Sequence, residues 1–391
     1  MKVDIAVVGA GPAGLCFARS LAGSGLSVAV VERQPREALA APAFDGREIA
    51  LTHASRRILE DLGLWQAFDP DAISTLRDAR VLDGDAADGL TIRSGDGRAD
   101  QLGWLVPNHV IRRAAFDLVA GQAGVELVDG RSVTAVAQAD GAMALALDDG
   151  GRIQTRLLVA ADSRFSQVRR MLGVGARSFD HGASMMVGRI AHTQPHGQLA
   201  QEWFDYGHTL ALLPLNGERS SVVLTLPPQR MREVEDMDDA AFAADIQRRT
   251  RGRLGEISAI GSRHVYPLVS VYADRFAGAR FALVGDAAVG MHPVTAHGFN
   301  LGLQGQAKLA EVVLRAHRGG RDIGSASLLA RYHRAHHAAA WPIYAGTRLV
   351  TRIYTDQRPG ARLLRRATLR IADRLPPFRR AIAARLTQRA P

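Results

Sequence analysis

Short apolar runs that end at glycine-rich turns dominate the hydrophobic pattern of this chain. Residues 3–8 (VDIAVV), 26–32 (LSVAVVE) and 280–288 (RFALVGDAA) have the length and β-branched content of buried strands. A helical pattern follows the first run, and another begins near residue 298. Buried strands that alternate with helices indicate an α/β fold around a largely parallel sheet.

The middle of the chain has a different pattern. Within residues 176–275, short alternating segments such as MMVGRIAHT, TLALLPL and SSVVLTL predict an antiparallel sheet, interrupted by a helix near 238–251. Residues 76–105 lose helical periodicity and carry Gly- and Asp-rich turns, so we expect strands of the same second layer there. Residues 106–175 return to the first pattern, with a helix over 110–124, a hairpin near 148–152 and a strand over 156–162.

Composition is that of a globular protein, with 47% apolar and 23% charged residues in 391. The single cysteine, Cys16, excludes an intrachain disulfide and fits a reducing compartment. The chain starts with a strand pattern rather than a signal peptide, and no apolar run reaches the ~20 residues of a membrane span. We therefore expect a cytoplasmic protein.

Positive charge is concentrated at the C-terminal end. Residues 342–391 contain 12 Arg, no Lys and only two acids, which accounts for the whole formal net charge of +10. The segment 361–375 (ARLLRRATLRIADRL) has the spacing of a basic amphipathic helix, which favours contact with an anionic membrane surface. A solvated helix packed on its own domain explains the same pattern. We expect no nucleic-acid partner, because no recognised binding fold is present.

A glycine motif stands where the first strand meets a helix. Gly9, Gly11 and Gly14 form G-x-G-x-x-G, in which the first glycine permits the turn and the second lets the backbone approach a pyrophosphate. Gly14 lets the helix pack on the sheet. The next strand ends in Glu32, followed by Arg33, and an acid at this place suits a ribose diol. This unit predicts a dinucleotide site.

A second glycine motif lies more than half the chain away. The strand over 280–288 contains Gly285-Asp286, and after His292-Pro293 a helix opens with Gly298, Asn300 and Gly302. A carboxylate beside a glycine-rich helix start can accept hydrogen bonds from a polyol while backbone N–H groups meet phosphate or ring oxygens. An NAD dehydrogenase needs no such second site, so the two motifs together favour FAD.

These segments, GAGPAG (9–14), AADSRFSQVRRMLG (160–173) and GDAAVGMHPVTAHGFNLGL (285–303), resemble the single-component FAD aromatic hydroxylases. With FDGREIALTHASRRILEDLGLW (44–65) and GHTLALLPL (207–215), the chain is most similar to the ubiquinone-biosynthesis hydroxylases, and within them to the UbiM-type branch. The resemblance implies a Rossmann-like FAD domain of the para-hydroxybenzoate-hydroxylase type with an inserted substrate sheet.

The expected domains follow from that fold. The FAD-binding domain is discontinuous, over 1–75, 106–175 and 276–341. The substrate-binding sheet takes 76–105 and 176–275, and residues 342–391 form a basic helical segment.

The resemblance also implies the chemistry and the residues of the site. Tightly but non-covalently bound FAD is reduced by NAD(P)H or another reductant and reacts with O2 to a C4a-hydroperoxide, which passes one oxygen to an electron-rich ring. The strand over 207–215 faces the flavin. No side-chain base is assigned; His292 and Pro293 flank the flavin face and the substrate pocket. The implied FAD contacts are Gly9, Gly11, Gly14, Glu32, Arg33, Arg47, Arg112 (with Arg113 as the alternative register), Asp162, Gly285, Asp286, Pro293, Gly298 and Asn300.

Some positions depart from the family pattern. Ser163 stands where most relatives have Gly, so a positive φ there carries a cost. Thr295-Ala296-His297 and Gly305 also differ, the last replacing an acid. His333 and His337 share a helix spacing but lack H-E-x-x-H and any nearby cysteine, so we expect an exposed helix face and no metal site.

The function expected from the resemblance is hydroxylation of a prenylated phenol or quinol in ubiquinone biosynthesis, at the inner face of the membrane and in contact with other proteins of that pathway. Position 5 of the ring is the best single choice, as a 5-demethoxyubiquinol hydroxylase acting at one ring position or several. The alternatives are a hydroxylase of a non-quinone phenol, a non-oxygenating flavin reductase, and an FAD-bearing accessory scaffold.

Overall fold

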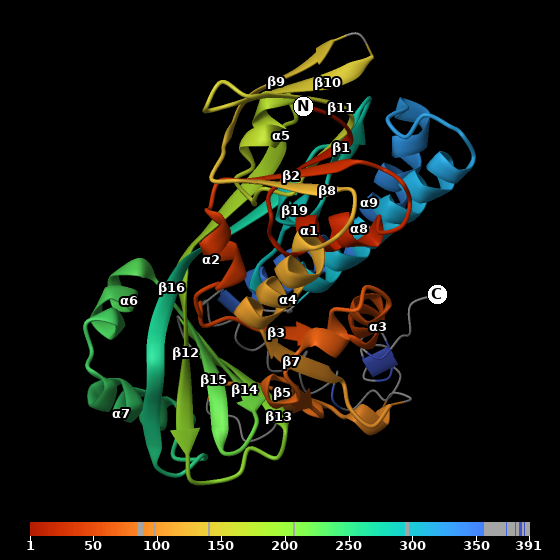
Figure 1. The fold of residues 1–391 in the computed structure, drawn as a ribbon. Helices are drawn as coiled ribbons and strands as arrows, with labels where there is room; N and C mark the ends of the chain where they lie inside the picture. Colours follow the sequence, from red (N-terminus) through yellow and green to blue (C-terminus); the bar gives the residue numbers. More distant parts are fainter. Residues whose placement is uncertain are drawn as a thin grey trace.

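The computed structural model describes residues 1–84, 89–96, 99–139, 141–205, 208–293 and 297–355, with Asp373, Arg380, Ala383, Ala384 and Thr387. Three sheets organise these residues, and Figure 1 shows the largest two as an upper and a lower layer.

The upper sheet is the parallel sheet that the apolar runs predict. Its strands run in the order β17 (Ala277–Gly278), β18 (Phe281–Leu283), β11 (Arg152–Ala160), β1 (Lys2–Val8), β2 (Val28–Glu32) and β8 (Val125–Asp129). All neighbouring pairs are parallel except β17 with β18. The antiparallel strands β9 (Val133–Ala139) and β10 (Ala142–Leu147) extend from β11, which accounts for the expected hairpin. The middle residues of β1 and β2 are fully buried, as strands covered on both faces require.

Figure 1 shows most of the helices beside this sheet on its lower side, whereas β9 and β10 lie above it. The main ones are α1 (Pro12–Ser20), α4 (Asn108–Ala120), α8 (Gly298–Arg318) and α9 (Ala326–Thr355), with the shorter α2 (Arg36–Ala40) and α5 (Gln167–Met171). Helix α8 packs against both α1 and α9, so the last third of the chain closes the layer that the first residues begin.

The lower sheet has eight strands. Their order is β19 (Val289–Gly290), β16 (Ile257–Ala273), β12 (Ala176–His192), β15 (Arg219–Leu226), β14 (His208–Leu215), β13 (Leu199–Asp205), β5 (Asp78–Asp83) and β6 (Gly89–Ile92). The sheet is antiparallel as expected, except that β13 and β5 pair in parallel. Helices α6 (Pro228–Glu235) and α7 (Asp239–Thr250) cover one face, where Phe242 and Ile246 are fully buried.

Two long strands join the layers. β12 and β16 have 17 residues each and pair from Ala176 opposite Ala273 to His192 opposite Ile257. Figure 1 shows both running from the upper layer to the far end of the lower sheet. The other face of the lower sheet therefore lies toward the nucleotide-binding layer.

A small third sheet fills the junction. It consists of β3 (Glu48–Leu51), β7 (Gly103–Pro107) and β4 (Ser74–Leu76), beside α3 (His53–Asp61). The strands expected over 76–105 are thus divided, because β5 and β6 join the lower sheet whereas β7 joins this one. Among the described residues, 3-10 turns complete the order: η1 (Trp65–Ala67), η2 (Pro70–Ala72), η3 (Ser94–Asp96) and η4 (Gly285–Ala287).

After α9, the basic C-terminal segment is described at five residues only, so the predicted helix over 361–375 lies outside the described residues except at Asp373. The Asp373 carboxylate accepts a hydrogen bond from Thr91 N at 3.1 Å, and Ala383 is fully buried against Leu90, Ile92 and Leu102. These two points of the segment therefore contact the edge of the lower sheet. Within the described part of the chain, no helix has the length and apolar character to cross a membrane.

Candidate active site

The two glycine motifs, separated by more than 270 positions, meet in the fold. Gly285 has φ +59°, and a Cβ added there would lie 2.8 Å from the Cβ of Ala13 at the start of α1. A Cβ at Gly302, in the first turn of α8, would lie 3.2 Å from the Cα of Gly285. The starts of α1 and α8 and the turn η4 therefore converge on one region above the carboxyl ends of β1 and β18.

In the loop between β1 and α1, two of the three glycines leave no room for a side chain. Gly9 has φ +108°, and a Cβ there would approach Ala161 O to 2.5 Å; a Cβ at Gly14 would approach Gly9 O to 2.0 Å. At Gly11, by contrast, no atom lies within 4 Å of an added Cβ. Gly11 is also the N-cap of α1 and supplies no side-chain cap. Uncapped N–H groups at an open helix start form an anion site.

Glu32 is fixed at the end of β2 by backbone donors. Ala10 N donates to its Oε2 at 2.8 Å and Gln34 N to its Oε1 at 3.0 Å. Arg33, the next residue, is exposed. Arg112 on α4 reaches the same loop, donating to Gln34 Oε1 at 3.2 Å. An oriented carboxylate beside the first glycine loop suits the hydroxyls of a ribose.

Arg113, the alternative to Arg112, points elsewhere. Its Nε lies 3.7 Å from Asp117 Oδ2, one turn along the same helix, with both side chains more than half exposed. Of the two arginines, the fold brings Arg112 to the loop after β2.

Arg47 lies just before β3, paired with a residue that sequence reasoning did not select. Its Nη2 is 2.5 Å from Asp45 Oδ2, which also accepts from Asn108 Nδ2 at 2.8 Å. Burial opposes ionisation of Asp45, but Arg47 and Asn108 outweigh it and hold the pKa of this carboxyl below its usual value. Arg47 also stacks over the ring of Tyr266 at 5.6 Å. The guanidinium is thus oriented while it remains accessible.

Asp162 has a local structural task in this fold. Its carboxylate accepts from Ser166 Oγ at 2.5 Å and from Gln167 N at 2.8 Å, which satisfies the start of α5. Its Cα lies directly under Gly9, 2.8 Å from where a Cβ would be. Ser163 does not adopt a positive φ, so the expected strain at this departure from the family pattern is absent.

Asp286 is paired with Arg164, which the sequence reading missed. Arg164 Nη2 and Nε lie 3.0 and 3.2 Å from Asp286 Oδ2, and Arg164 Nη1 donates to Val269 O at 3.0 Å. Both side chains remain partly exposed. Arg164 lies two residues after Asp162 in the segment AADSRFSQVRRMLG (160–173). Its position in that segment is the sequence signal that could have identified it.

The flavin-loop residues differ in exposure. His292 is buried, and its ring contacts His181 edge-to-face at 4.6 Å. Burial first, then His181 and Arg164, lower the pKa of His292 to about 3, so the imidazole is neutral at physiological pH. Pro293 is exposed, and residues 294–296, which include Thr295 and Ala296, lie outside the described residues.

The start of α8 ties the second motif to β3. Asn300 is 3% exposed; its Nδ2 donates to Ala50 O at 2.7 Å and its Oδ1 accepts from Thr52 N at 3.1 Å. Gly298 begins the helix without a side-chain cap from His297, and of the described residues an added Cβ would meet Met291 at 3.9 Å. The start of α8, like that of α1, therefore has no side-chain cap of its own.

One face of the lower sheet lies toward this loop region. A Cβ at Gly46 would meet Val187 Cγ2 at 2.6 Å, so the loop before β3 packs on β12. In register with Val187, across successive strands, stand Val223, Ala211 and Glu202. Directly opposite residues share a face. That face is apolar with a few polar groups, the character of a small-molecule site.

Two polar side chains on this face were not selected from the sequence. Burial raises the pKa of Glu202 to about 8, so this carboxyl holds its proton at neutral pH. Arg189, opposite Ser221, is paired with Glu48, whose side chain is fully buried. The Oε2 of Glu48 and the Oγ of Ser221 are buried and have no hydrogen-bond partner among the described residues. Burial raises the pKa of Glu48 despite Arg189.

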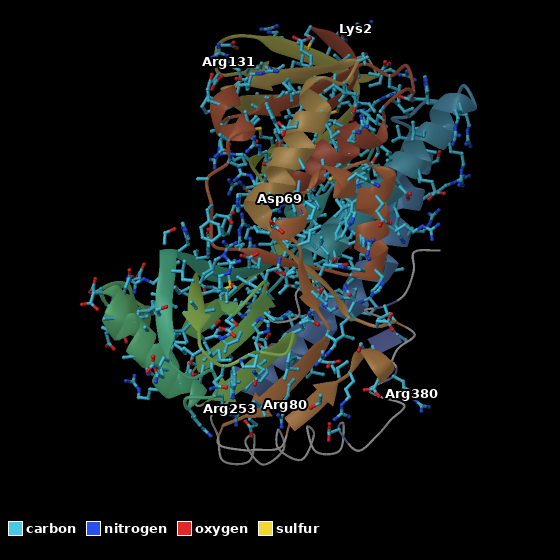
Figure 2. The ribbon with its side chains drawn as sticks, turned by 60° about the horizontal axis from the view of Figure 1, so that its bottom comes forward. Lys2, Asp69, Arg80, Arg131, Arg253 and Arg380 are labelled. Carbon is cyan, nitrogen blue, oxygen red and sulfur yellow. The ribbon has the colours of Figure 1, made fainter. Side chains whose placement is uncertain are left out.

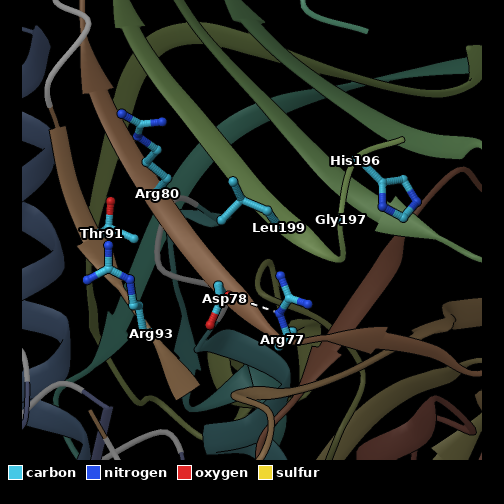
Figure 3. Close-up of a pocket in the computed structure, with 8 residues that line it drawn as sticks. All are labelled: Arg77, Asp78, Arg80, Thr91, Arg93, His196, Gly197 and Leu199. Atoms are coloured by element: carbon cyan, nitrogen blue, oxygen red, sulfur yellow. Dashed lines mark hydrogen bonds and ion pairs between the residues drawn. The ribbon is translucent and has the colours of Figure 1, made fainter. Parts of the chain in front are cut away.

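A separate cavity of about 340 Å3 opens at the far edge of the lower sheet (Figure 3). It is lined by residues in or next to β5 and β6 and by the turn that leads into β13: Arg77, Asp78, Arg80, Thr91, Arg93, His196, Gly197 and Leu199. Arg77 pairs with Asp78 within it. Figure 2 shows Arg80 and Arg253 at this end of the molecule, far from Lys2 and Arg131 on the upper sheet. None of the residues expected to contact FAD lines this cavity.

The histidines on α9 correct one expectation. The face with His333 and His337 was expected to be exposed, but both are half-buried. His336, between them in the sequence, is 1% exposed and stacks on Tyr332 at 5.6 Å, with its ring beside Gly305. A Cβ at Gly305 would lie 2.6 Å from His336 Nε2. In the described part of the chain, no three His, Cys, Asp or Glu side chains are grouped as metal ligands.

The converging loops fit FAD. Two uncapped helix starts, the open position at Gly11, an oriented Glu32 and the accessible Arg47 and Arg112 provide for a pyrophosphate and its ribose. Asp286 lies in the turn η4, beside the start of α8. There its carboxylate can accept hydrogen bonds from the ribityl chain of FAD. The class that fold and site define is the FAD-dependent monooxygenase of the GR2 type.

Comparison with known proteins agrees. Residues 2–347 match the family model described as "FAD binding domain". The chain is 44% identical to the ubiquinone hydroxylase UbiM of Neisseria meningitidis, over 98% of this chain and 84% of that protein. It is 33% identical to the ubiquinone hydroxylase UbiL of Rhodospirillum rubrum, over 96% and 87%. The chain therefore belongs to the FAD-binding-domain family, in the group of the ubiquinone-biosynthesis hydroxylases.

The fold has solved counterparts. The p-nitrophenol 4-monooxygenase PnpA of Pseudomonas putida superposes with a TM-score of 0.80 over the full length of both chains, at 18% identity. At that identity the likeness shows the fold alone.

Proposed function

We propose that this protein hydroxylates the aromatic ring of a prenylated phenol or quinol intermediate of ubiquinone biosynthesis, with FAD as cofactor and NAD(P)H or another reductant and O2 as co-substrates. The best single assignment is 5-demethoxyubiquinol 5-hydroxylation, with action at further ring positions as the broader form. Identity of 44% to a ubiquinone hydroxylase along 98% of the chain is the observation that carries this proposal.

The roles of the chain's own residues follow from the geometry. The α1 start at Gly11, with Arg47 and Arg112, holds the pyrophosphate by charge-assisted hydrogen bonds, and Glu32 accepts from the ribose. Asp286, oriented by Arg164, accepts from the polyol chain. FAD, when bound, supplies the reduction of O2 and the transfer of one oxygen atom.

We propose that the substrate ring lies on the face of the lower sheet that carries Glu202. Thr209, Ala211 and Leu213 of β14 share this face with Glu202, because residues opposite each other in β13 and β14 point to the same side. An apolar wall positions a ring and keeps water out, while a protonated Glu202 can donate to a ring oxygen. His292, neutral and buried, lies beside His181 of β12.

The domain boundaries given above are part of this proposal: the cofactor is held by residues of 1–75, 106–175 and 276–341, and the substrate by 76–105 and 176–275. Membrane association through the basic segment 342–391, and contact with other proteins of the pathway, are proposed on its charge and on the location of prenylated substrates in the bilayer.

The test is complementation. The chain is expressed in bacterial strains that each lack one ubiquinone ring hydroxylase, and their quinones are measured by mass spectrometry. Restored ubiquinone in one strain gives the ring position; restoration in several gives a broad regiospecificity. No restoration in any strain, with FAD-loaded protein present, contradicts the proposal and favours a non-quinone phenol, a non-oxygenating reductase or an accessory scaffold.

A further inference from the structure

The second half of α9 presents an exposed stripe that combines apolar and cationic side chains. Trp341 is 41% and Leu349 60% exposed, and Arg348 is also exposed. Positions 341, 348 and 349 fall on one side of a helix of 3.6 residues per turn. Large apolar side chains are not normally left exposed together on one face.

Strand β12 extends this stripe. The guanidinium of Arg348 lies over the ring of Phe179 at 5.0 Å, and Phe179 is 44% exposed. Arg177, two residues earlier on the same side of the strand, is exposed as well. We call the five residues Phe179, Trp341, Leu349, Arg177 and Arg348 the α9 patch.

The charges of the patch are not neutralised within the described chain. Neither Arg177 nor Arg348 forms an ion pair there. Both lie near Tyr344. Burial raises the pKa of Tyr344, and the two arginines offset part of this increase. Trp341 is held by contacts with Tyr272 at 5.4 Å, so the indole is a fixed anchor rather than a loose side chain.

The patch also leads to the flavin loop. The Phe179 ring contacts His181 at 4.8 Å, and His181 contacts the buried His292 at 4.6 Å. His292 is adjacent to Pro293. A continuous row of rings therefore joins the exposed stripe to the region where the proposed chemistry takes place.

From these observations we infer that the α9 patch docks on the surface of an anionic lipid bilayer and that prenylated substrate enters from it beside His181. Trp341 and Leu349 enter the interfacial region of the bilayer, while Arg177 and Arg348 contact lipid phosphates. The sequence after α9 continues this charge, since residues 356–391 contain 10 Arg and two Asp. The docking is independent of the activity, whereas substrate entry rests on the proposed function.

The first experiment measures docking with the full-length, FAD-loaded chain. Co-sedimentation is compared for vesicles of phosphatidylcholine alone and with 30 mol% phosphatidylglycerol. Each arginine near an anionic surface contributes about 1 kcal/mol, so the double variant Arg177→Gln/Arg348→Gln should lose roughly 30-fold in partitioning. Arg230→Gln/Arg232→Gln on α6, which covers the other face of the lower sheet, is the matched control and should bind like wild type.

The apolar part is tested in the same assay. Leu349→Glu should lose on the order of tenfold in partitioning, because it places an acid at the interface, while Leu349→Met should retain it. Ile260→Glu adds the same charge at a 36% exposed site near the far end of β16 and should bind normally. Trp341 emission should shift to the blue with anionic vesicles, a shift that Trp341→Phe abolishes.

Substrate entry is tested by turnover. Leu349→Glu should lose activity on a long-chain quinol embedded in vesicles and keep it on a short-chain, water-soluble quinol. Wild type that binds vesicles but turns over neither substrate would contradict the proposed function and leave docking supported. Wild type that does not bind anionic vesicles, or patch variants that bind as wild type, would overturn docking. Light scattering that shows a dimer in wild type and a monomer in Leu349→Glu would also overturn docking on lipid, because the patch would then join two copies of the chain.

Discussion

The upper and lower sheets build their parts of the site by different means. In the upper layer the site is made of backbone: Gly9, Gly14 and Gly285 are required because a Cβ would collide with neighbouring atoms within 3 Å. In the lower sheet the corresponding face is made of side chains, with Glu202 and the pair of Arg189 and Glu48 among apolar residues. The cofactor loops are thus shaped by steric constraint on the backbone, whereas the face that we propose for the substrate consists of side chains that can be exchanged one at a time.

The sharpest test of the backbone part compares two glycines of one loop. Gly14→Ala places a Cβ about 2.0 Å from Gly9 O, which backbone must move to relieve. We expect a loss above about 3 kcal/mol in the free energy of unfolding and little FAD in the purified protein. Gly11→Ala meets no atom within 4 Å and should keep the apo melting temperature while FAD affinity falls. Equal melting temperatures for both variants would contradict this account.

The two acids of the cofactor region should matter through ligand contacts rather than folding. Glu32→Ala or Asp286→Ala removes an acceptor of charge-assisted hydrogen bonds, so FAD affinity should fall by about tenfold or more. Asp129→Ala is the matched control, because Asp129 ends β8 opposite Glu32 and accepts from Arg36 N instead. Absorbance of bound flavin gives the answer. Unchanged FAD content in Glu32→Ala and Asp286→Ala would show the assignments to be wrong.

A substitution at Asn300 tests the contact between the start of α8 and strand β3. Asn300→Ala leaves Ala50 O and Thr52 N without their partner in a buried place, which should cost about 2 kcal/mol in unfolding free energy. Urea denaturation of the apo protein measures it. If apo stability is unchanged and only FAD binding falls, Asn300 acts at the flavin and not as a structural bridge.

The last test concerns the lower sheet. Burial raises the Glu202 pKa from 4.5 to about 8, so the folded chain keeps a proton that the unfolded chain loses. Stability should therefore decline as pH rises from 4.5 to 8 and level off above that. Glu202→Gln should flatten this decline and leave FAD content unchanged. Thermal melts across that pH range give the comparison, and an unaltered pH profile in Glu202→Gln would contradict the raised pKa.

Much of the upper layer follows from short windows of sequence. The buried runs that become β1, β2 and β18, the G-x-G-x-x-G turn and the GD loop are set by β-branched content and glycine sterics within about ten residues. That is why FAD could be expected before any tertiary contact was known. The resemblance to the ubiquinone-biosynthesis hydroxylases extended this expectation to the fold as a whole.

Only the tertiary structure decided which distant groups meet. Arg164 faces Asp286 across 122 positions, and Asn300 reaches Ala50 across 250. The pKa of Glu202 and the burial of His336 depend on what surrounds them, which no local period encodes. His333 and His337 have the spacing of an exposed face, yet packing on Tyr272 and Phe276 overrides it. Neighbouring residues determine the local backbone conformation. The burial of a side chain and its hydrogen-bond partners depend on how strands far apart in the chain pair and pack.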